Sequence, residues 1–289
     1  MSANPMPAAD GLETRLHAIC DAQPFRTSFH VRRLDTGQAF GRDERTPTPS
    51  ASTRKVSIMM AALKAVHEGR LDMDELIPVE DRLKKDVASG TYRYMTSGTV
   101  MPLQDAVTNM IITSDNVCTQ MVLERLTLDQ MNAFCRGIGM TGTHHAHLIP
   151  PLDLPPDHPV SAGTSTTPAD QGKLLEMILR GAEDPAAAAL LGSTPALCAH
   201  ALDVLSWQQF REQIPALLPY GTRVCNKTGR GKRGRMDVGV VYRDDRPAYV
   251  ITAFTDGVPD TMPDGLPGHA AAFRTVALLS RACWDATEG

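Results

Sequence analysis

The sequence has little of what marks several specialised classes of protein. Only 5% of its 289 residues are aromatic, and 29 Lys and Arg against 33 Asp and Glu leave a net charge of −4. This balance predicts neither a nucleic-acid partner nor an anionic membrane partner. The cysteines are too scattered for a disulfide framework or a metal site to be recognised, and they are Cys20, Cys118, Cys135, Cys198, Cys225 and Cys283.

No apolar run is long enough to span a membrane, and residues 1–10 contain neither a positively charged region nor an apolar segment. We therefore predict a cytoplasmic protein with reduced thiols, without a membrane partner. The sequence does not indicate an oligomeric state. With 42% hydrophobic and 21% charged residues the composition is that of an ordinary globular protein, so motifs must indicate the function.

Strand patterns occur near both ends of the chain, and helical patterns lie between them. The predicted strands are 27–34, 38–42, 223–227, 236–243 and 248–255. The predicted helices are 10–20, 55–68, 103–113, 116–126, 128–137, 168–181 and 269–284. This order predicts an α/β (α+β) fold, in which 1–50 and 215–289 form a domain with an antiparallel sheet and 51–214 form an inserted, mainly helical domain.

A proline-rich stretch at 144–166 is too long for a passive connection, so we expect a functional loop. Four histidines in or near it, His144, His145, His147 and His158, have no fitting cysteine or carboxylate spacing. They favour an exposed polar loop over a metal site. No metal or organic cofactor is implied.

Three short motifs follow one another in an order that suits serine acyl transfer. The first is Ser52-Thr53-Arg54-Lys55 at the start of a predicted helix. Residues three apart share a helical face, so the Lys55 amine can reach the Ser52 hydroxyl and accept its proton. The helix N-terminus supplies N–H groups where an oxyanion will form.

The second motif is Ser114-Asp115-Asn116, in a break between two helices, and the third is Lys227-Thr228-Gly229 on a strand. Ser114 is a candidate to relay a proton to the leaving group, and Asn116 to hold the Lys55 amine and an acylamide oxygen. Lys227 supplies positive charge near Ser114 and a substrate carboxylate. Thr228 supplies a hydroxyl donor, and Gly229 permits a close backbone approach.

Together the motifs resemble those of the class A β-lactamases and related penicillin-recognising serine hydrolases, over nearly the whole chain. The resemblance implies a β-lactamase-like fold, with Ser52 as acylated nucleophile, Lys55 as general base and Ser114 as proton shuttle. It also implies that Asn116 binds the substrate and Lys55, and that Lys227 and Thr228 bind a carboxylate. By the same match, the backbone N–H groups of Ser52 and Arg230 form the oxyanion hole.

The loop departs from the family pattern, because class A β-lactamases carry E-x-x-L-N there. In one alignment register, Ile149 stands at the glutamate position and Asp153 at the asparagine position. In a later register, Pro151 stands at the glutamate position and Pro155 at the asparagine position. Three alternatives stay open. Asp153 acts as the deacylating base, Lys55 serves both half-reactions, or deacylation is slow and the acyl group passes to another acceptor.

A basic run, Arg230-Gly231-Lys232-Arg233-Gly234-Arg235, follows the third motif. It is either a solvated strand end or a source of positive potential at the mouth of the site that favours anionic substrates. The family's arginine on the next strand is displaced, since Met236 stands near that place and Arg235 one residue earlier. Arg230 and Arg235 are therefore candidate substrate-binding residues.

The sequence thus predicts a serine hydrolase that cleaves an amide, lactam or ester bond in a small, carboxylated substrate through a Ser52 acyl-enzyme. Two other interpretations remain. The chain is a residual β-lactamase or D-Ala-type peptidase, or it is a non-hydrolytic acyl-binding, sensor or acyl-transfer protein.

Overall fold

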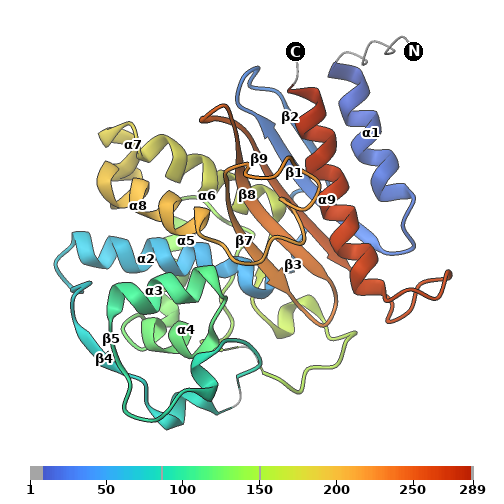
Figure 1. Ribbon diagram of the computed structural model, residues 1–289. Coiled ribbons are helices and arrows are strands. Elements are labelled where there is room, and N and C mark those ends of the chain that lie inside the picture. Colours follow the sequence, from blue (N-terminus) through green and yellow to red (C-terminus); the bar gives the residue numbers. More distant parts are fainter. Residues whose placement is uncertain (1–8, 86, 150, 288–289) are drawn as a thin grey trace.

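The computed structural model describes residues 9–85, 87–149 and 151–287 and contains a five-stranded antiparallel sheet (Figure 1). Its strand order is β2-β1-β9-β8-β7. The strands are β1 (Arg26–Arg33), β2 (Ala39–Arg42), β7 (Val224–Arg230), β8 (Arg235–Arg243) and β9 (Arg246–Asp256). Strand β1 pairs with β9, for example Val31 opposite Ile251, so the two ends of the chain build one sheet.

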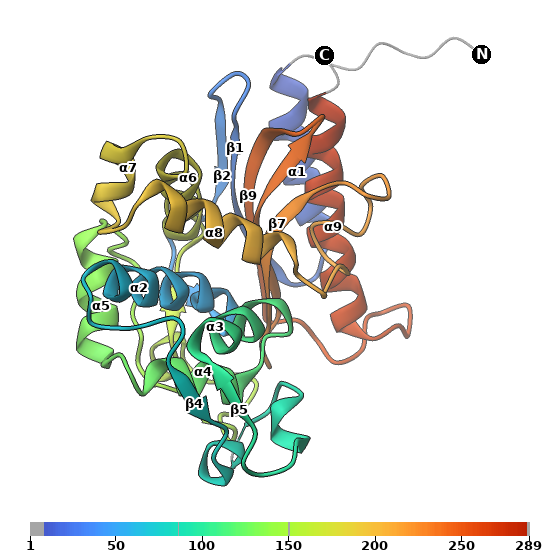
Figure 2. The same cartoon turned by 60° about the vertical axis from the view of Figure 1, so that its left-hand side comes forward.

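Helices α1 (Ala9–Asp21) and α9 (Gly268–Ala286) lie side by side on one face of this sheet (Figures 1 and 2). Apolar side chains of both helices pack against alternate strand residues, among them Leu16, Leu279 and Ile251, which are completely buried. Because successive side chains of a strand point to opposite faces of the sheet, every second strand residue packs into the hydrophobic core on this face.

The remaining helices form a layer beyond the other face of the sheet (Figure 2). They are α2 (Lys55–His67), α3 (Leu103–Ile112), α4 (Asn116–Leu123), α5 (Leu128–Gly137), α6 (Pro168–Gly181), α7 (Pro185–Leu190) and α8 (Pro195–Ser206). Helix α2 is buried from Lys55 to Leu63, as expected for a helix that is apolar on all sides. Lys55, the first residue of this helix, is therefore held in place by a buried, closely packed segment.

Two short strand pairs complete the structure: β3 (Thr48–Pro49) with β6 (Ser165–Thr166), and β4 (Leu76–Pro78) with β5 (Val100–Pro102). The first pair joins the end of the long loop to the segment that leads into Ser52. The predicted fold class is confirmed. Helices α7 and α8 were not predicted from the sequence, and the predicted domain boundaries remain a prediction.

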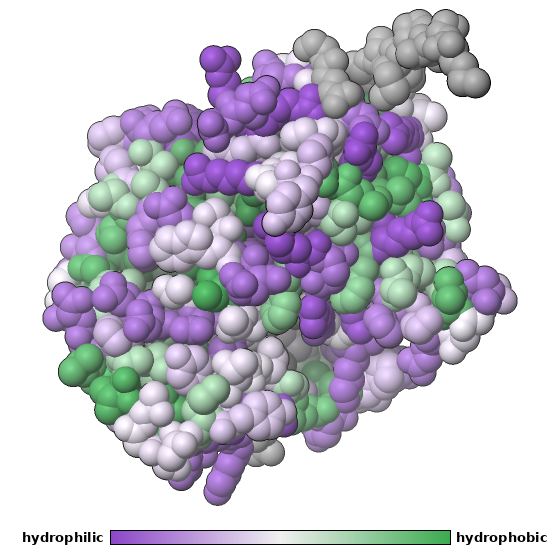
Figure 3. Space-filling view, in the orientation of Figure 1, coloured by the Kyte–Doolittle hydropathy of each residue, from purple (hydrophilic) through white to green (hydrophobic). Residues whose placement is uncertain are grey.

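Hydrophilic and hydrophobic residues are interspersed on the face shown in Figure 3. Among the described residues, no helix combines the length and the apolar character needed to cross a bilayer. All six cysteines are buried free thiols. The cytoplasmic location expected from the sequence remains a prediction.

Candidate active site

Ser52 lies in a short 3-10 turn, η1 (Ala51–Arg54), directly before helix α2. In 3-10 geometry, residues three apart lie above one another, so the turn places Ser52 and Lys55 on one side, as the motif predicts. Ser50 holds the start of the turn through bonds from its backbone N and its Oγ to the Thr164 carbonyl, both 3.0 Å long. Both Ser52 and Lys55 line a cavity.

The Lys55 amine is buried and donates to Ser114 Oγ at 3.1 Å, to the Ser114 carbonyl at 2.8 Å and to Asn116 Oδ1 at 2.8 Å. The structure thus brings together the first two motifs. Burial, followed by the positive charges of Lys227 and Arg54, holds the pKa of Lys55 well below its usual value, while Asp115 opposes the shift. The lowered pKa makes the neutral amine, which is the form that accepts a proton, easier to reach than in an ordinary lysine.

The backbone around Ser114 is strained, with φ of 56° at this residue. Asp115 then caps helix α4 by accepting from the backbone N of Val117 and of Cys118, and its other oxygen accepts from Tyr92 N. Gly90 packs so closely on Asp115 that a Cβ would stand 2.2 Å from its Cγ. Asp115 therefore fixes the break between helices α3 and α4 that presents Ser114 and Asn116 to the cavity.

The third motif lies on strand β7, at the edge of the sheet nearest to η1. Thr228 lines the cavity. A Cβ on Gly229 would stand 3.2 Å from the Ala51 Cβ and 2.5 Å from Met236 Cγ, so only glycine permits this approach to the turn that carries Ser52. Lys227 is buried, and its amine donates to the Thr228 carbonyl at 2.7 Å. It makes no bond to Ser114 in the described structure.

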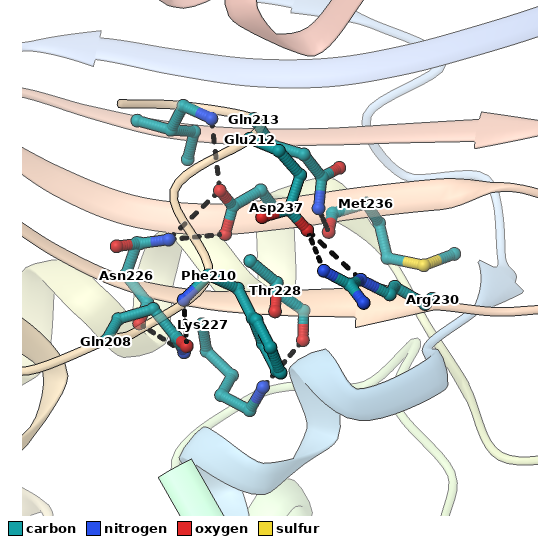
Figure 4. A network of polar contacts seen from close by, with 11 residues as sticks. Gln208, Phe210, Glu212, Gln213, Asn226, Lys227, Thr228, Arg230, Met236 and Asp237 are labelled. Atoms are coloured by element: carbon teal, nitrogen blue, oxygen red, sulfur yellow. Dashed lines mark hydrogen bonds and ion pairs between the residues drawn. The ribbon is translucent and has the colours of Figure 1, made fainter. Parts of the chain in front are cut away.

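A buried carboxylate that sequence analysis missed, Asp237 on strand β8, lies beside this motif (Figure 4). Asn226 Nδ2 donates to both of its oxygens at 3.1 Å, and Ile214 N donates at 3.1 Å. Figure 4 shows the Asp237 carboxylate and the Lys227 amine directed away from each other. Burial lowers the pKa of Lys227 to about 7, whereas the charge of Asp237 raises it. Burial also raises the pKa of Asp237 to about 7.

The residues of the basic run differ in their position relative to the cavity. Arg230, Lys232 and Arg233 line the cavity, whereas Arg235 is not part of its wall. The Arg235 guanidinium instead donates to the carbonyls of Gly231 and Gly234 and stacks 5.5 Å from the centroid of the Phe273 ring. The side chain of Arg235 thus contacts the β7–β8 turn, and the role of Arg235 in substrate binding remains a prediction.

The long loop contributes Pro151, Leu152, Leu154 and His158 to the cavity wall. Asp153 is exposed to solvent and is not part of the wall, so the structure does not bring this predicted base into the site. Lys232 fixes the loop by donating to the Leu152 and Leu154 carbonyls at 2.7 and 2.6 Å. Pro151, the residue of the later register, stands on the wall, whereas Ile149 does not.

The cavity has a volume of about 720 Å³. Among the described residues, no Asp or Glu contributes to its wall, and the cations on it are Arg54, Lys55, Arg93, Arg230, Lys232 and Arg233. Within the same residues, no group of three or more His, Cys, Asp and Glu is placed to hold a metal ion. The site can thus supply a hydroxyl nucleophile, an amine base, N–H and O–H donors, and positive charge.

Solved structures with the same fold include a β-lactamase from Sphaerobacter thermophilus DSM 20745, with a TM-score of 0.81, 23% identity, and 97% of this chain and 98% of that chain covered. PBP-A superposes with a TM-score of 0.78 and 23% identity over 98% of this chain and 100% of its own. An ancestral class A β-lactamase superposes with a TM-score of 0.81 and 23% identity, over 95% of this chain and 99% of its own.

No curated protein matches the sequence. These structural likenesses establish the fold. Residues of all three motifs line the cavity: Ser52 and Lys55, Ser114 and Asn116, and Thr228. The family model described as the beta-lactamase enzyme family matches residues 11–287, nearly the whole chain, and the protein therefore belongs to this family.

Proposed function

We propose that the protein is a serine hydrolase that cleaves an amide, lactam or ester bond of a small anionic substrate through an acyl-enzyme on Ser52. The observation that carries the proposal is the Lys55 amine, which is 1% exposed and whose acceptors are the Ser114 and Asn116 oxygens. Among the described residues it has no carboxylate partner. With its pKa lowered by burial, this amine can lose a proton and then act as a general base toward a serine hydroxyl.

In acylation, Lys55 accepts the proton of Ser52 Oγ as this oxygen attacks the substrate carbonyl. The tetrahedral oxyanion is stabilised by the backbone N–H groups of Ser52 and Arg230. When the bond to the leaving group breaks, the proton passes from Lys55 through Ser114 to the leaving nitrogen or oxygen, along the hydrogen bond of 3.1 Å. The leaving group departs neutral, and Lys55 is again a free base.

In deacylation, water attacks the ester carbonyl of the acyl-enzyme, and its proton must be accepted near Ser52. Asp153 is exposed and absent from the cavity wall, and no other described Asp or Glu lies on that wall. Lys55 is therefore the base that we propose for this step, with the proton finally returned to Ser52 Oγ. The same residue then serves both half-reactions.

The anionic preference is supported by the charge of the cavity wall, which has cations and, within the described chain, no acidic side chain. Lys227 and Thr228 are proposed to bind a carboxylate on the leaving-group side. Thr228 lies on the cavity wall, whereas the Lys227 amine is buried behind that wall and is proposed to act through its charge. Lys227 needs its proton for this role, and the nearby charge of Asp237 favours the protonated form.

A second candidate function is acylation by β-lactams without rapid hydrolysis. A mutant of PBP-A has been solved as an acyl-enzyme complex with penicillin G, and it shares this fold with a TM-score of 0.76. The missing glutamate favours slow deacylation, as does the Pro151 side chain on the cavity wall. A protein that stops at the adduct would act as an acyl-binding sensor or acyl-transfer protein.

Intact-mass spectrometry against a set of aryl esters, amides and β-lactams tests the proposal, with Ser52→Ala as the matched control. We expect adducts on the parent protein and none on the variant, with steady product release for at least one ester or amide. A single equivalent of product followed by a halt would instead support the sensor. Unchanged turnover in Ser52→Ala would refute the covalent mechanism.

A further inference from the structure

Arg54, the second variable residue of the first motif, is 2% exposed and yet contributes to the cavity wall. Its Nη1 donates to the His147 carbonyl at 2.7 Å and to Thr164 Oγ1 at 3.4 Å, and its Nη2 donates to the Leu148 carbonyl. A guanidinium has five N–H groups. Two of them, including that on Nε, therefore have no acceptor among the described residues.

Every protein acceptor of Arg54 in the described structure is neutral. Of the three other arginines on the cavity wall, Arg230 pairs with Glu212 and Arg233 with Asp256, whereas Arg93 donates to the Val87 carbonyl and stacks on Tyr94. Arg54 is the most deeply buried of the four, at 2% exposure. A buried charge without a counter-ion is costly, and a protein normally compensates it with an ion pair. Burial alone lowers the pKa of Arg54, to about 10, so it still carries its charge at neutral pH.

We propose that Arg54 binds an anionic group on the acyl portion of the substrate, so that the preferred substrates are half-amides or half-esters of small dicarboxylic acids. The inference rests on the proposed function of Ser52. A carboxylate matches the paired N–H donors of an arginine edge, and this charge-assisted contact is among the stronger hydrogen bonds in proteins.

The direction of the two side chains assigns this anion to the acyl portion. Lys55 reaches Ser114, where the leaving group receives its proton, whereas the neighbouring Arg54 reaches the loop at His147 and Leu148. Consecutive residues of a helical segment diverge by about 100°. When the carbonyl carbon is bound to Ser52 and the leaving group lies at Ser114, the acyl chain extends toward the loop and Arg54.

The experiment compares p-nitrophenyl hydrogen glutarate with its neutral match, methyl p-nitrophenyl glutarate. Both carry the same leaving group, and only the first carries an acyl-side charge. The charged ester also loses nitrophenolate by intramolecular attack of its own carboxylate, so each rate is corrected for the rate of the same ester without protein and with Ser52→Ala. The corrected second-order constants for nitrophenolate release give a charged-to-neutral ratio. We expect a ratio above about 10 in the parent protein, since a hydrogen bond to a charged group is typically worth tenfold or more.

In Arg54→Gln the ratio should fall at least tenfold, whereas Lys232→Gln should keep it within about threefold. Lys232 is the matched control because it too is a cation of the wall that donates to loop carbonyls. Any change in the pKa of Lys55 on removal of Arg54 affects both esters alike and cancels in the ratio. Arg54→Lys, which keeps the charge without the paired donors, should give an intermediate ratio.

A ratio near 1 in the parent protein would overturn the inference, and this measurement needs no variant to fold. An unchanged ratio with both constants lowered in Arg54→Gln would mean that Arg54 only fixes the loop. An equal fall in both variants would point to the general field of the cavity and would also overturn it. If neither ester acylates Ser52, it is the proposed function that fails.

Discussion

The Lys55 amine and the Ser114 hydroxyl are joined by a hydrogen bond of 3.1 Å, and the Ser114 carbonyl accepts a second bond of 2.8 Å from the same amine. The base Lys55 is therefore connected directly to the proton relay Ser114. Acylation consists of attack by Ser52 and departure of the leaving group, and substrates with different leaving groups can separate these two steps. The relay matters only when the leaving group needs a proton.

Replacement of Ser114 by Ala should thus discriminate between amides and activated esters. We expect amide cleavage to fall by about 10²- to 10⁴-fold, the usual range for general acid catalysis, because an amine leaves only when protonated. Acylation by a p-nitrophenyl ester should fall less than tenfold, since nitrophenolate needs no proton. Initial rates and adduct masses measure both. Lys55→Met is the control, because it should impair both substrates, and equal losses in Ser114→Ala would contradict the relay.

The acylation rate with an ester should rise with pH, be half-maximal at the pKa of Lys55 and reach a plateau above it, and this pKa lies well below that of an ordinary lysine. The sign follows from the mechanism, because only the neutral amine accepts the Ser52 proton and acid converts it to the inactive form. Lys227→Met removes a nearby positive charge that lowers this pKa. It should therefore move the profile to higher pH. Stopped-flow rates between pH 5 and 9 provide the measurement, and a shift to lower pH would contradict the assignment of Lys55 as the base.

Recognition of a leaving-group carboxylate should weaken as pH rises above about 7, where Lys227 loses its proton. The ratio of rates for 3-carboxyphenyl acetate and phenyl acetate reports this preference. In Asp237→Asn the charge that raises the pKa of Lys227 is gone, so the same loss should occur at lower pH. Arg230, which lowers that pKa, and Glu212, which raises it, are unchanged in the variant.

Arg235→Gln is the control for this prediction, because Arg235 lies outside the cavity wall and should leave the ratio within about twofold. An Asp237→Asn profile that coincides with the parent profile would show that the charge of Asp237 does not act on Lys227 in this pH range, and would contradict the prediction.

Substitutions in the loop at Asp153, Pro151 and Ile149 should differ in their effect on the rate of deacylation. Asp153→Asn should leave deacylation within about twofold of the parent rate, because Asp153 is exposed and not on the cavity wall. Pro151→Glu places a carboxylate on that wall and should speed deacylation at least tenfold, whereas Ile149→Glu should not. The decay of acyl-enzyme mass after a pulse of ester measures each rate. Accumulation of adduct in Asp153→Asn would restore the aspartate as the base.

Sequence reasoning identified the three motifs and the sheet because these signals are local: a spacing of three, strand alternation and turn residues. It missed helix α7 and helix α8, although Asp184-Pro185 and Thr194-Pro195 each combine a capping residue with a proline at the first helical position. Helix α7 has only six residues, too few for a periodic apolar stripe to be recognised. Helix α8 has twelve residues and buries Cys198, Ala201, Leu202 and Leu205 at helical spacing, so its signal was present in the sequence and was overlooked.

Long-range contacts were beyond the reach of the sequence. Asp237 resembles any polar residue at the start of a strand, and its importance comes from Asn226 and Ile214, which it meets only in the folded chain. Arg54 occupies a variable position of its motif, and only the structure shows that it is buried without a carboxylate partner in the described residues. The choice of Asp153 as a base depends on one of two possible loop registers. Backbone torsions determine which loop side chains face the cavity, and no sequence pattern indicates those torsions.

Gly229→Ala should destabilise the protein and impair acylation together. The new Cβ would stand 2.5 Å from Met236 Cγ and 3.2 Å from the Ala51 Cβ, so either Met236 or the turn that carries Ser52 must move. We expect a loss of about 1–3 kcal/mol in the free energy of unfolding, which is typical of overpacking, measured by urea denaturation. Gly137→Ala is the control, since nothing lies within 4 Å of its Cβ position and alanine favours helix α5.

The double variant Gly229→Ala with Met236→Ala separates the two contacts. Removal of the methionine side chain relieves the clash at 2.5 Å but leaves the contact of 3.2 Å with Ala51. Relative to the sum of the single variants, the double variant should therefore regain stability, as a coupling energy in a double-mutant cycle. Its acylation rate should stay low, because the strand still presses on the turn that positions Ser52. Full recovery of acylation would show that Met236, and not the approach of strand β7 to Ala51, is what requires glycine at this position.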